Sequence, residues 1–143
     1  AFMSRDLYRK MVKPHHAQEI ETIRKHTKAY VVLHSDGAIF DLIPDLIDAG
    51  VQVLNPVQTS ASGMDPQRLK RAFGRNLRFW GGIDTQRVLP RGTPADVAAE
   101  VRTRISDLGR NGGYVLASVH NIQAEVPPEN IVAMFETARS LSS

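Results

Sequence analysis

Short apolar runs alternate with longer stretches in which apolar and polar residues are mixed. Four runs rich in Val, Leu and aromatic residues predict short buried strands at residues 30–33, 51–54, 77–80 and 114–117. In the longer stretches, apolar residues recur every three to four positions, which is typical of helices that cover one face of a sheet. The pattern therefore predicts a strand followed by a helix four times, after a helical N-terminal segment.

Capping residues place the helix boundaries. We expect helices at residues 4–11 and 14–25, before the first strand, and at 39–49, 66–73, 94–108 and 128–138. Pro66 and Pro94 follow a cap-forming Asp and Thr, and proline is well tolerated in a first turn. Gly50 stands where the 39–49 helix should end. We expect Asn55-Pro56 to end the second strand and Gly81-Gly82 to end the third.

Consecutive strands should run parallel, because each connection contains a helix. Two α/β architectures fit: a small open sheet, or half of a (β/α)8 barrel, which needs about 250 residues and eight such units. The leading helical segment has no strand before it, which favours a fragment of a barrel. Residues 1–143 then form a single partial domain of four parallel strands, each followed by a helix.

Composition removes several classes of protein. The chain has 143 residues, 18 Lys and Arg against 15 Asp and Glu, a formal charge of +3 and no cysteine. Disulfide scaffolds, iron–sulfur sites, cysteine nucleophiles and zinc fingers are thereby excluded. The basic residues are scattered, so we expect no nucleic-acid partner. Without a signal-peptide pattern or a membrane-spanning run, we expect a cytoplasmic protein with no membrane association.

Polar residues follow every predicted strand, at the edge where parallel α/β folds bind ligands. They are His34 and Asp36, Asn55 and Gln58, Asp84 and Gln86, and His120 and Asn121.

His34 and Asp36 are separated by one residue, so in an extended chain both side chains point the same way. They could be two metal ligands, or a base with its orienting carboxylate. Alternatively, Asp36 caps the next helix and His34 forms a hydrogen bond at the rim. His120 could be catalytic or could anchor its loop, and Gly81-Gly82 allow a ligand or a neighbouring backbone to approach closely.

Several stretches in chain order resemble the uroporphyrinogen decarboxylase family, which includes corrinoid-linked methyltransferases. They are Val31 to Gly37, Leu46 to Gln58, Leu69 to Gly74, Phe79 to Asp84 and Val126 to Ile131. The family fold is a TIM barrel, and the resemblance implies that this chain is its C-terminal half.

The resemblance implies one of two chemistries. The decarboxylases convert uroporphyrinogen III to coproporphyrinogen in porphyrin biosynthesis without a metal or organic cofactor, and His120 would help hold the substrate carboxylates. The methyltransferases bind zinc through a His-x-Cys pair and a cysteine after the last strand, which would correspond to His34, Asp36 and His120 here. Nitrogen and oxygen ligands could still hold zinc or another divalent ion.

The departures from the decarboxylase pattern favour metal-dependent methyl transfer linked to a corrinoid. His34, Asp36 and His120 would then form the metal or acid–base centre. The expected partners are a tetrapyrrole or corrinoid-related substrate and a corrinoid protein, and the remaining polar residues would orient the substrate: Asn55, Gln58, Asp84, Gln86 and Asn121.

An alternative from another class of function is an inactive half-barrel. Four strands leave two open edges and an apolar inner face, which monomers rarely tolerate. This interpretation predicts a homodimer or another partner that completes the sheet.

Overall fold

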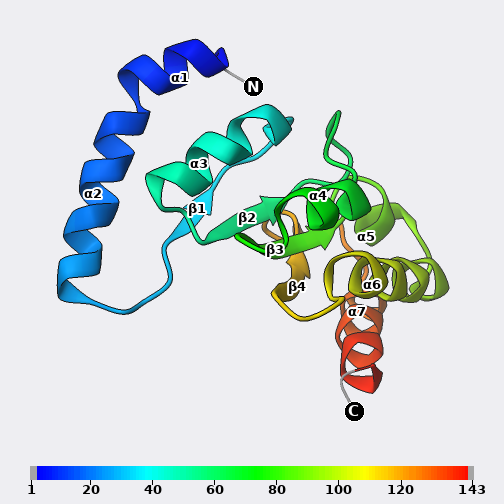
Figure 1. Ribbon diagram of the computed structural model, residues 1–143. Helices are drawn as coiled ribbons and strands as arrows, with labels where there is room; N and C mark the ends of the chain where they lie inside the picture. The colour runs from blue at the N-terminus through cyan, green and yellow to red at the C-terminus, as the bar shows by residue number, and fades with distance from the viewer. Residues whose placement is uncertain (1–2, 142–143) are drawn as a thin grey trace.

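The computed structural model describes residues 3–141, which form an α/β structure (Figure 1). Its strands are β1 (Val32–His34), β2 (Val53–Val57), β3 (Arg78–Ile83) and β4 (Tyr114–Ser118). Its helices are α1 (Arg5–Met11), α2 (Lys13–His26), the 3-10 helix η1 (Phe40–Leu42), α3 (Ile43–Ala49), α4 (Pro66–Phe73), α5 (Val88–Arg91), α6 (Pro94–Leu108) and α7 (Pro128–Ser140).

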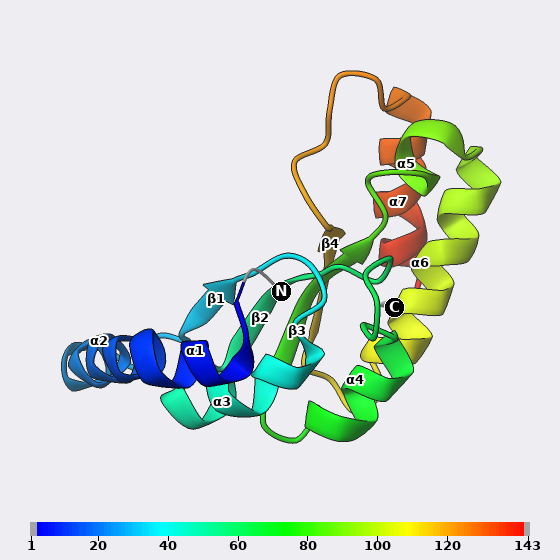
Figure 2. The same ribbon diagram turned by 90° about the horizontal axis from the view of Figure 1, so that it is seen from above.

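The four strands form one parallel sheet in the order β1-β2-β3-β4. Seen from above, the strands follow an arc, and helices α3, α4, α6 and α7 lie along its outer side (Figure 2). A parallel sheet covered by helices on its outer side alone is half of a (β/α)8 barrel. The predicted fold class is therefore confirmed.

The two faces of the sheet differ sharply in burial. Leu33, Leu54 and Phe79 occupy one row of the register and point into the helical layer. Val32, Trp80 and Val115 belong to the opposite, concave face, where they are 45%, 39% and 50% exposed. The prediction that the first strand is buried is therefore wrong for one of its faces, because nothing in the described chain covers the concave side of β1.

Two strands continue past the residues expected to end them. β2 includes Asn55 and Pro56, and a register shift between Leu54 and Val57 accommodates a proline that has no N–H for the ladder. β3 includes both glycines, and a Cβ on Gly81 would lie 3.0 Å from the Val57 backbone nitrogen. The close approach of a neighbouring backbone is confirmed at Gly81, whereas Gly82 lies against the Tyr114 side chain, and neither glycine ends the strand.

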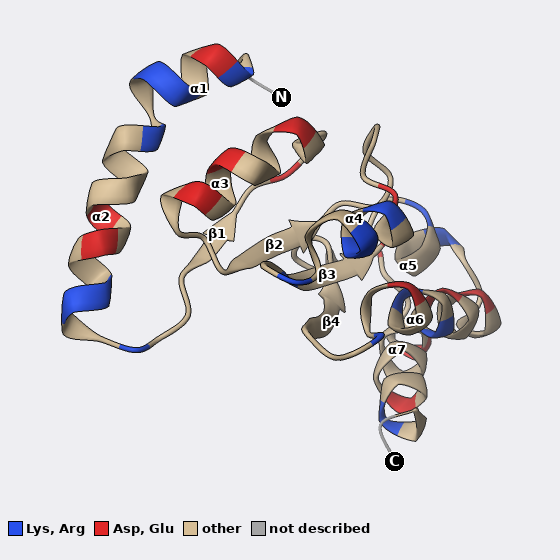
Figure 3. Cartoon of the chain, viewed as in Figure 1, with Lys and Arg blue, Asp and Glu red and all other residues tan. Residues whose placement is uncertain are grey.

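Helices α1 and α2 pack on α3 through Tyr8 and Ile20, and they also share one buried carboxylate of α3. Asp45 is 3% exposed and accepts hydrogen bonds from Arg5 Nε at 2.6 Å, Arg9 Nε at 2.9 Å and Lys13 Nζ at 3.0 Å. The three donors are four residues apart and so face the same side of the α1–α2 segment. The bonds from Arg5 and Arg9 hold the pKa of Asp45 well below its usual range. Figure 3 shows this pattern, with basic residues on α1 and acidic residues on α3.

The C-terminal half is held by apolar packing. Leu89, Val97, Val101 and Met134 belong to a cluster contributed by α5, α6 and α7. Beside it, the buried Asn130 donates through Nδ2 to the carbonyl oxygens of Leu89 and Gly92, both at 2.8 Å. This amide ties α7 to the short helix α5, which the sequence pattern did not predict.

Within residues 3–141, every helix is too short or too polar to cross a bilayer.

Candidate functional site

His34 ends β1 and is held by two polar neighbours. Its Nδ1 lies 2.8 Å from Asn55 Oδ1, and its Nε2 lies 3.1 Å from Asp36 Oδ2. His34 and Asn55 are register partners on adjacent strands, which brings their side chains together on the concave face. The expected pairing of His34 with Asp36 is therefore present, and Asn55 completes a row of three polar groups.

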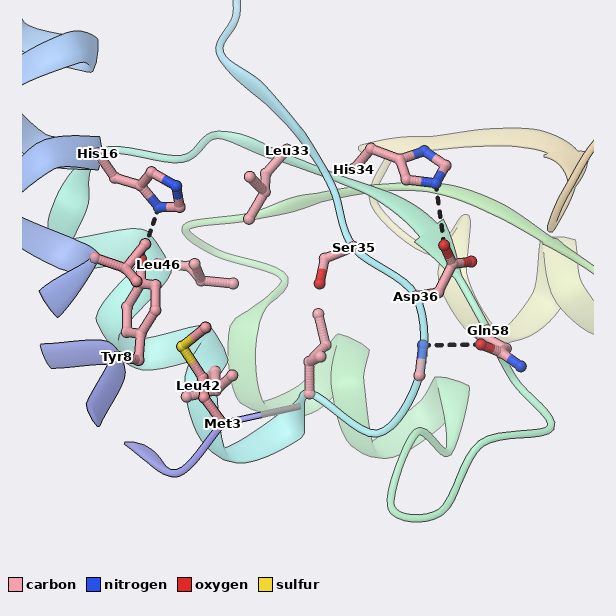
Figure 4. Close-up of a pocket in the computed structure, with 13 residues that line it drawn as sticks. Met3, Tyr8, His16, Leu33, His34, Ser35, Asp36, Leu42, Leu46 and Gln58 are labelled. Carbon is pink, nitrogen blue, oxygen red and sulfur yellow. Dashed lines mark hydrogen bonds and ion pairs between the residues drawn. The ribbon is translucent and has the colours of Figure 1, made fainter. Parts of the chain in front are cut away.

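Gln58 connects the loops that follow β1 and β2. Its Oε1 accepts a hydrogen bond of 2.8 Å from the Gly37 backbone N–H, as Figure 4 shows. This bond fixes the segment that carries Asp36 against the end of β2. Asp36 does not cap the next helix, because η1 and α3 begin after Ile39 and Leu42 without a side-chain cap. The capping interpretation of Asp36 is thus wrong.

A small polar hollow lies where the loops after all four strands meet. Its volume is about 250 Å³, and it is lined by Asp36, Gln58, Ser60, Asp84, Thr85, Gln86, Val119 and His120. Each of the four strands is followed by at least one of these residues, as expected for the carboxyl edge of a parallel sheet. We call this site the polar hollow.

Asp84 shapes the turn that forms one wall of the polar hollow. Its Oδ1 accepts from the backbone N–H groups of Gln86 at 2.6 Å and Arg87 at 3.1 Å. Its own N–H donates to Glu100 Oε2 on α6 at 3.3 Å. The sequence analysis did not single out Glu100, because one acidic residue within an amphipathic helix gives no local signal of contact with a distant loop.

Asn55 and Asn121 are the predicted substrate-binding residues that do not line the polar hollow. Asn55 contacts His34, and the backbone oxygen of Asn121 accepts from Gln123 Nε2 at 3.1 Å.

The structure does not assemble the three expected metal ligands. Within residues 3–141, no three His, Asp or Glu side chains are arranged to hold a metal ion. Asp36 and His120 line the same polar hollow, while His34 faces the neighbouring cavity. In this arrangement, His34, Asp36 and His120 do not fit a three-ligand metal site.

A larger and mainly apolar cavity, which was not predicted from the sequence, adjoins the polar hollow. Its volume is about 640 Å³, and it lies between the α1–α2 segment, α3 and β1 (Figure 4). Tyr8 and His16, whose Oη and Nδ1 atoms are 3.1 Å apart, line one end, while Asp36 and Gln58 are shared with the polar hollow.

The charge of the polar hollow is negative. Asp36 and Asp84 line it, and none of its described lining residues is Lys or Arg. The site therefore offers carboxylate, amide, hydroxyl and imidazole groups to a ligand, but no permanent cation.

This chain forms a parallel half-barrel with polar residues gathered at the carboxyl edge of its strands. It therefore belongs to the class of α/β-barrel folds, which bind ligands at that edge. The family model for uroporphyrinogen decarboxylase (URO-D) matches residues 1–141. The chain belongs to the uroporphyrinogen decarboxylase family.

Solved structures share this fold. A methyltransferase from Methanosarcina mazei superposes with a TM-score of 0.77 at 22% sequence identity, over 99% of this chain. The chain spans 39% of the length of that protein. No curated protein sequence is similar enough to count as a match.

Proposed function

We propose that this chain provides the acceptor-binding part of an enzyme that transfers a methyl group from a corrinoid to a thiol. The observation that carries the proposal is the His34–Asp36 pair beside the polar hollow, with Nε2 and Oδ2 3.1 Å apart. A thiol must lose its proton before its sulfur can attack a methyl group, and an imidazole–carboxylate pair can take up that proton.

The S–H bond of the acceptor breaks, and the His34–Asp36 pair takes the proton. The sulfur then forms a bond to the methyl carbon, while the cobalt–carbon bond breaks and leaves its electron pair on cobalt. Asn55 keeps the ring of His34 in place through its contact with Nδ1. No part of this step requires a metal held by His34, Asp36 and His120.

The charge of the polar hollow supports methyl transfer over the second candidate, decarboxylation of uroporphyrinogen. That substrate carries several carboxylates, which would meet the like charges of Asp36 and Asp84. Decarboxylation draws support from His120, which lines the polar hollow and could donate a hydrogen bond to an acetate group.

The test follows the absorbance of methylcobalamin mixed with 2-mercaptoethanol and the protein. We expect the protein to accelerate demethylation, and Asp36→Asn to slow the reaction roughly 10- to 100-fold because the proton acceptor is weakened. Asp41→Asn is the matched control, since Asp41 is exposed on η1 and lines neither cavity.

A parallel assay with uroporphyrinogen separates the two chemistries. Its consumption, lost in His120→Ala, would replace methyl transfer by decarboxylation. If neither substrate reacts, the third interpretation holds: the half-barrel is inactive without a partner on its concave face. Light scattering then tests for the homodimer that we propose in that case.

A further inference from the structure

Glu100 lies behind the polar hollow rather than in it. Its side chain is 10% exposed, on the side of α6 that packs against the sheet. It does not belong to the lining of the polar hollow. A carboxylate this deeply buried is costly unless it has partners, so its contacts indicate what it does.

The first contact of Glu100 is with the turn that follows β3. Oε2 accepts from the Asp84 backbone N–H at 3.3 Å, at the first residue beyond the strand. Asp84 in turn organises the N–H groups of Gln86 and Arg87. One carboxylate on α6 therefore fixes the start of a turn whose next two residues, Thr85 and Gln86, line the polar hollow.

The second contact of Glu100 is with Arg104, one helical turn further along α6. Arg104 Nε lies 3.7 Å from Glu100 Oε1, and its Nη1 lies 3.3 Å from Asp107 Oδ2. The guanidinium is 18% exposed, so its charge offsets those of the two buried carboxylates.

The end of β3 is fixed independently of Glu100. Tyr114 Oη on β4 donates to the Gly81 carbonyl at 2.7 Å, and a Cβ on Gly82 would lie 2.9 Å from that hydroxyl oxygen. The strand is paired with β4 up to Ile83, and the Asp84 turn directly beyond it is bonded to α6.

We propose that Glu100 is a positioning residue, which acts through the Asp84 N–H to set the turn that forms one wall of the polar hollow. Its importance for catalysis rests on the proposed function, but its effect on the turn can be measured without any substrate.

Burial raises the pKa of Glu100, and the bond from Asp84 and the charge of Arg104 oppose that effect. The charged or titratable groups around it are Asp84 and Arg87 in the turn, Arg104 and Asp107 on α6, Asp65 before α4, and Tyr114 on β4. As the pH falls, Glu100 should accept a proton before an ordinary glutamate does. The Asp84 turn should then loosen only slightly over the same pH range, by no more than about threefold in protection, because a protonated carboxyl keeps an acceptor oxygen.

The experiment measures amide hydrogen exchange at Asp84, Gln86 and Arg87 by NMR in the 143-residue chain, over a range of pH. We expect Glu100→Leu to lower the protection of the Asp84 amide roughly tenfold, the effect of losing one hydrogen bond to a charged acceptor. Glu100→Gln keeps an acceptor oxygen, so protection should stay within about threefold of the wild type. The change in protection of the Asp84 amide that follows the titration of Glu100 should be missing, because Gln does not titrate, while the Gln86 and Arg87 amides still respond to Asp84. Glu136→Gln, at an exposed position on α7, is the control.

Unchanged Asp84 exchange in a folded Glu100→Leu protein would overturn the proposal. If that variant does not fold, the Glu100→Gln profile decides: a pH dependence identical to the wild type would overturn it as well. The proposed function can fail separately, since the absence of methyl transfer by the wild type leaves the exchange result intact.

Discussion

The two ends of the sheet are covered by helices that are attached in different ways. At the β1 end, the α1–α2 segment is joined to α3 by three cations around Asp45. At the β4 end, α5, α6 and α7 share an apolar cluster in which Leu89, Val97 and Val101 are fully buried. The first attachment combines these ion pairs with the apolar packing of Tyr8 and Ile20, so it depends in part on ionisation, whereas the second depends on shape and on excluding water.

The difference affects the two cavities. The ionic attachment forms one side of the apolar cavity, since Tyr8 and His16 line it. The apolar cluster supports the helix that carries Glu100, and through it the Asp84 wall of the polar hollow. The first cavity should therefore respond to pH and to charge substitutions, while the hollow should respond to changes in core packing.

The largest effect should come from a cavity in the apolar cluster. Leu89→Ala removes a fully buried side chain and should lower the free energy of unfolding by about 2–5 kcal/mol. Urea denaturation measures this change. The control is Val132→Ala on α7, where the side chain is 52% exposed, and it should cost less than about 0.5 kcal/mol. Equal losses of unfolding free energy in the two variants would show that burial in the apolar cluster does not stabilise this end of the sheet.

Removing the charge of Asp45 should have a smaller and local effect. Asp45→Asn leaves three cations around a neutral amide, and we expect a cost of about 1–3 kcal/mol, confined to α1 and α2. Hydrogen exchange should increase in residues 5–26 and remain unchanged in α6 and α7.

Asp48→Asn is the control for Asp45, because Asp48 also contacts Lys13 but is 73% exposed. Its cost should stay below about 1 kcal/mol. An equal effect of the two substitutions would show that burial of Asp45 does not matter.

The smallest effect should be the response to acid. Because the folded pKa of Asp45 is lowered, its stabilisation is complete above the pKa of an ordinary Asp and is lost as the pH falls through the folded value. Protection of the α2 amides should therefore hold from pH 7 to about pH 5 and decline below about pH 4. In Asp45→Asn this acid-dependent decline should be missing; if it persists, another group is responsible.

Much of the fold could be predicted from the sequence, because local signals decide it. Capping at Asp65 and Thr93 and the glycine after α3 place the helices, and all three positions match the structure. The ends of the strands were harder to predict, because proline and glycine, here Pro56 and Gly81, usually interrupt strands. Here a register shift and a close backbone contact keep them in the ladder.

The site was predicted in part. The loops after all four strands do meet, as topology requires, so Asp36, Gln58, Asp84, Gln86 and His120 line one hollow. The sequence pattern could not predict that His34 would line the neighbouring cavity instead of the hollow that contains His120. Long-range contacts such as that of Asp84 with Glu100, 16 residues apart, leave no pattern in one sequence.

Asn130 extends the control of the hollow to the last helix of the described chain. Its amide donates hydrogen bonds to two carbonyl groups, one in α5 and one at its end, and α5 begins directly after the turn that Asp84 organises. The segment from Asp84 to Gly92 is thus held at one end by Glu100 of α6 and at the other by Asn130 of α7, two helices that come later in the sequence. A protease cut or a truncation that removed α7 would therefore loosen the Asp84 turn in the wall of the polar hollow, although no α7 side chain lines that hollow.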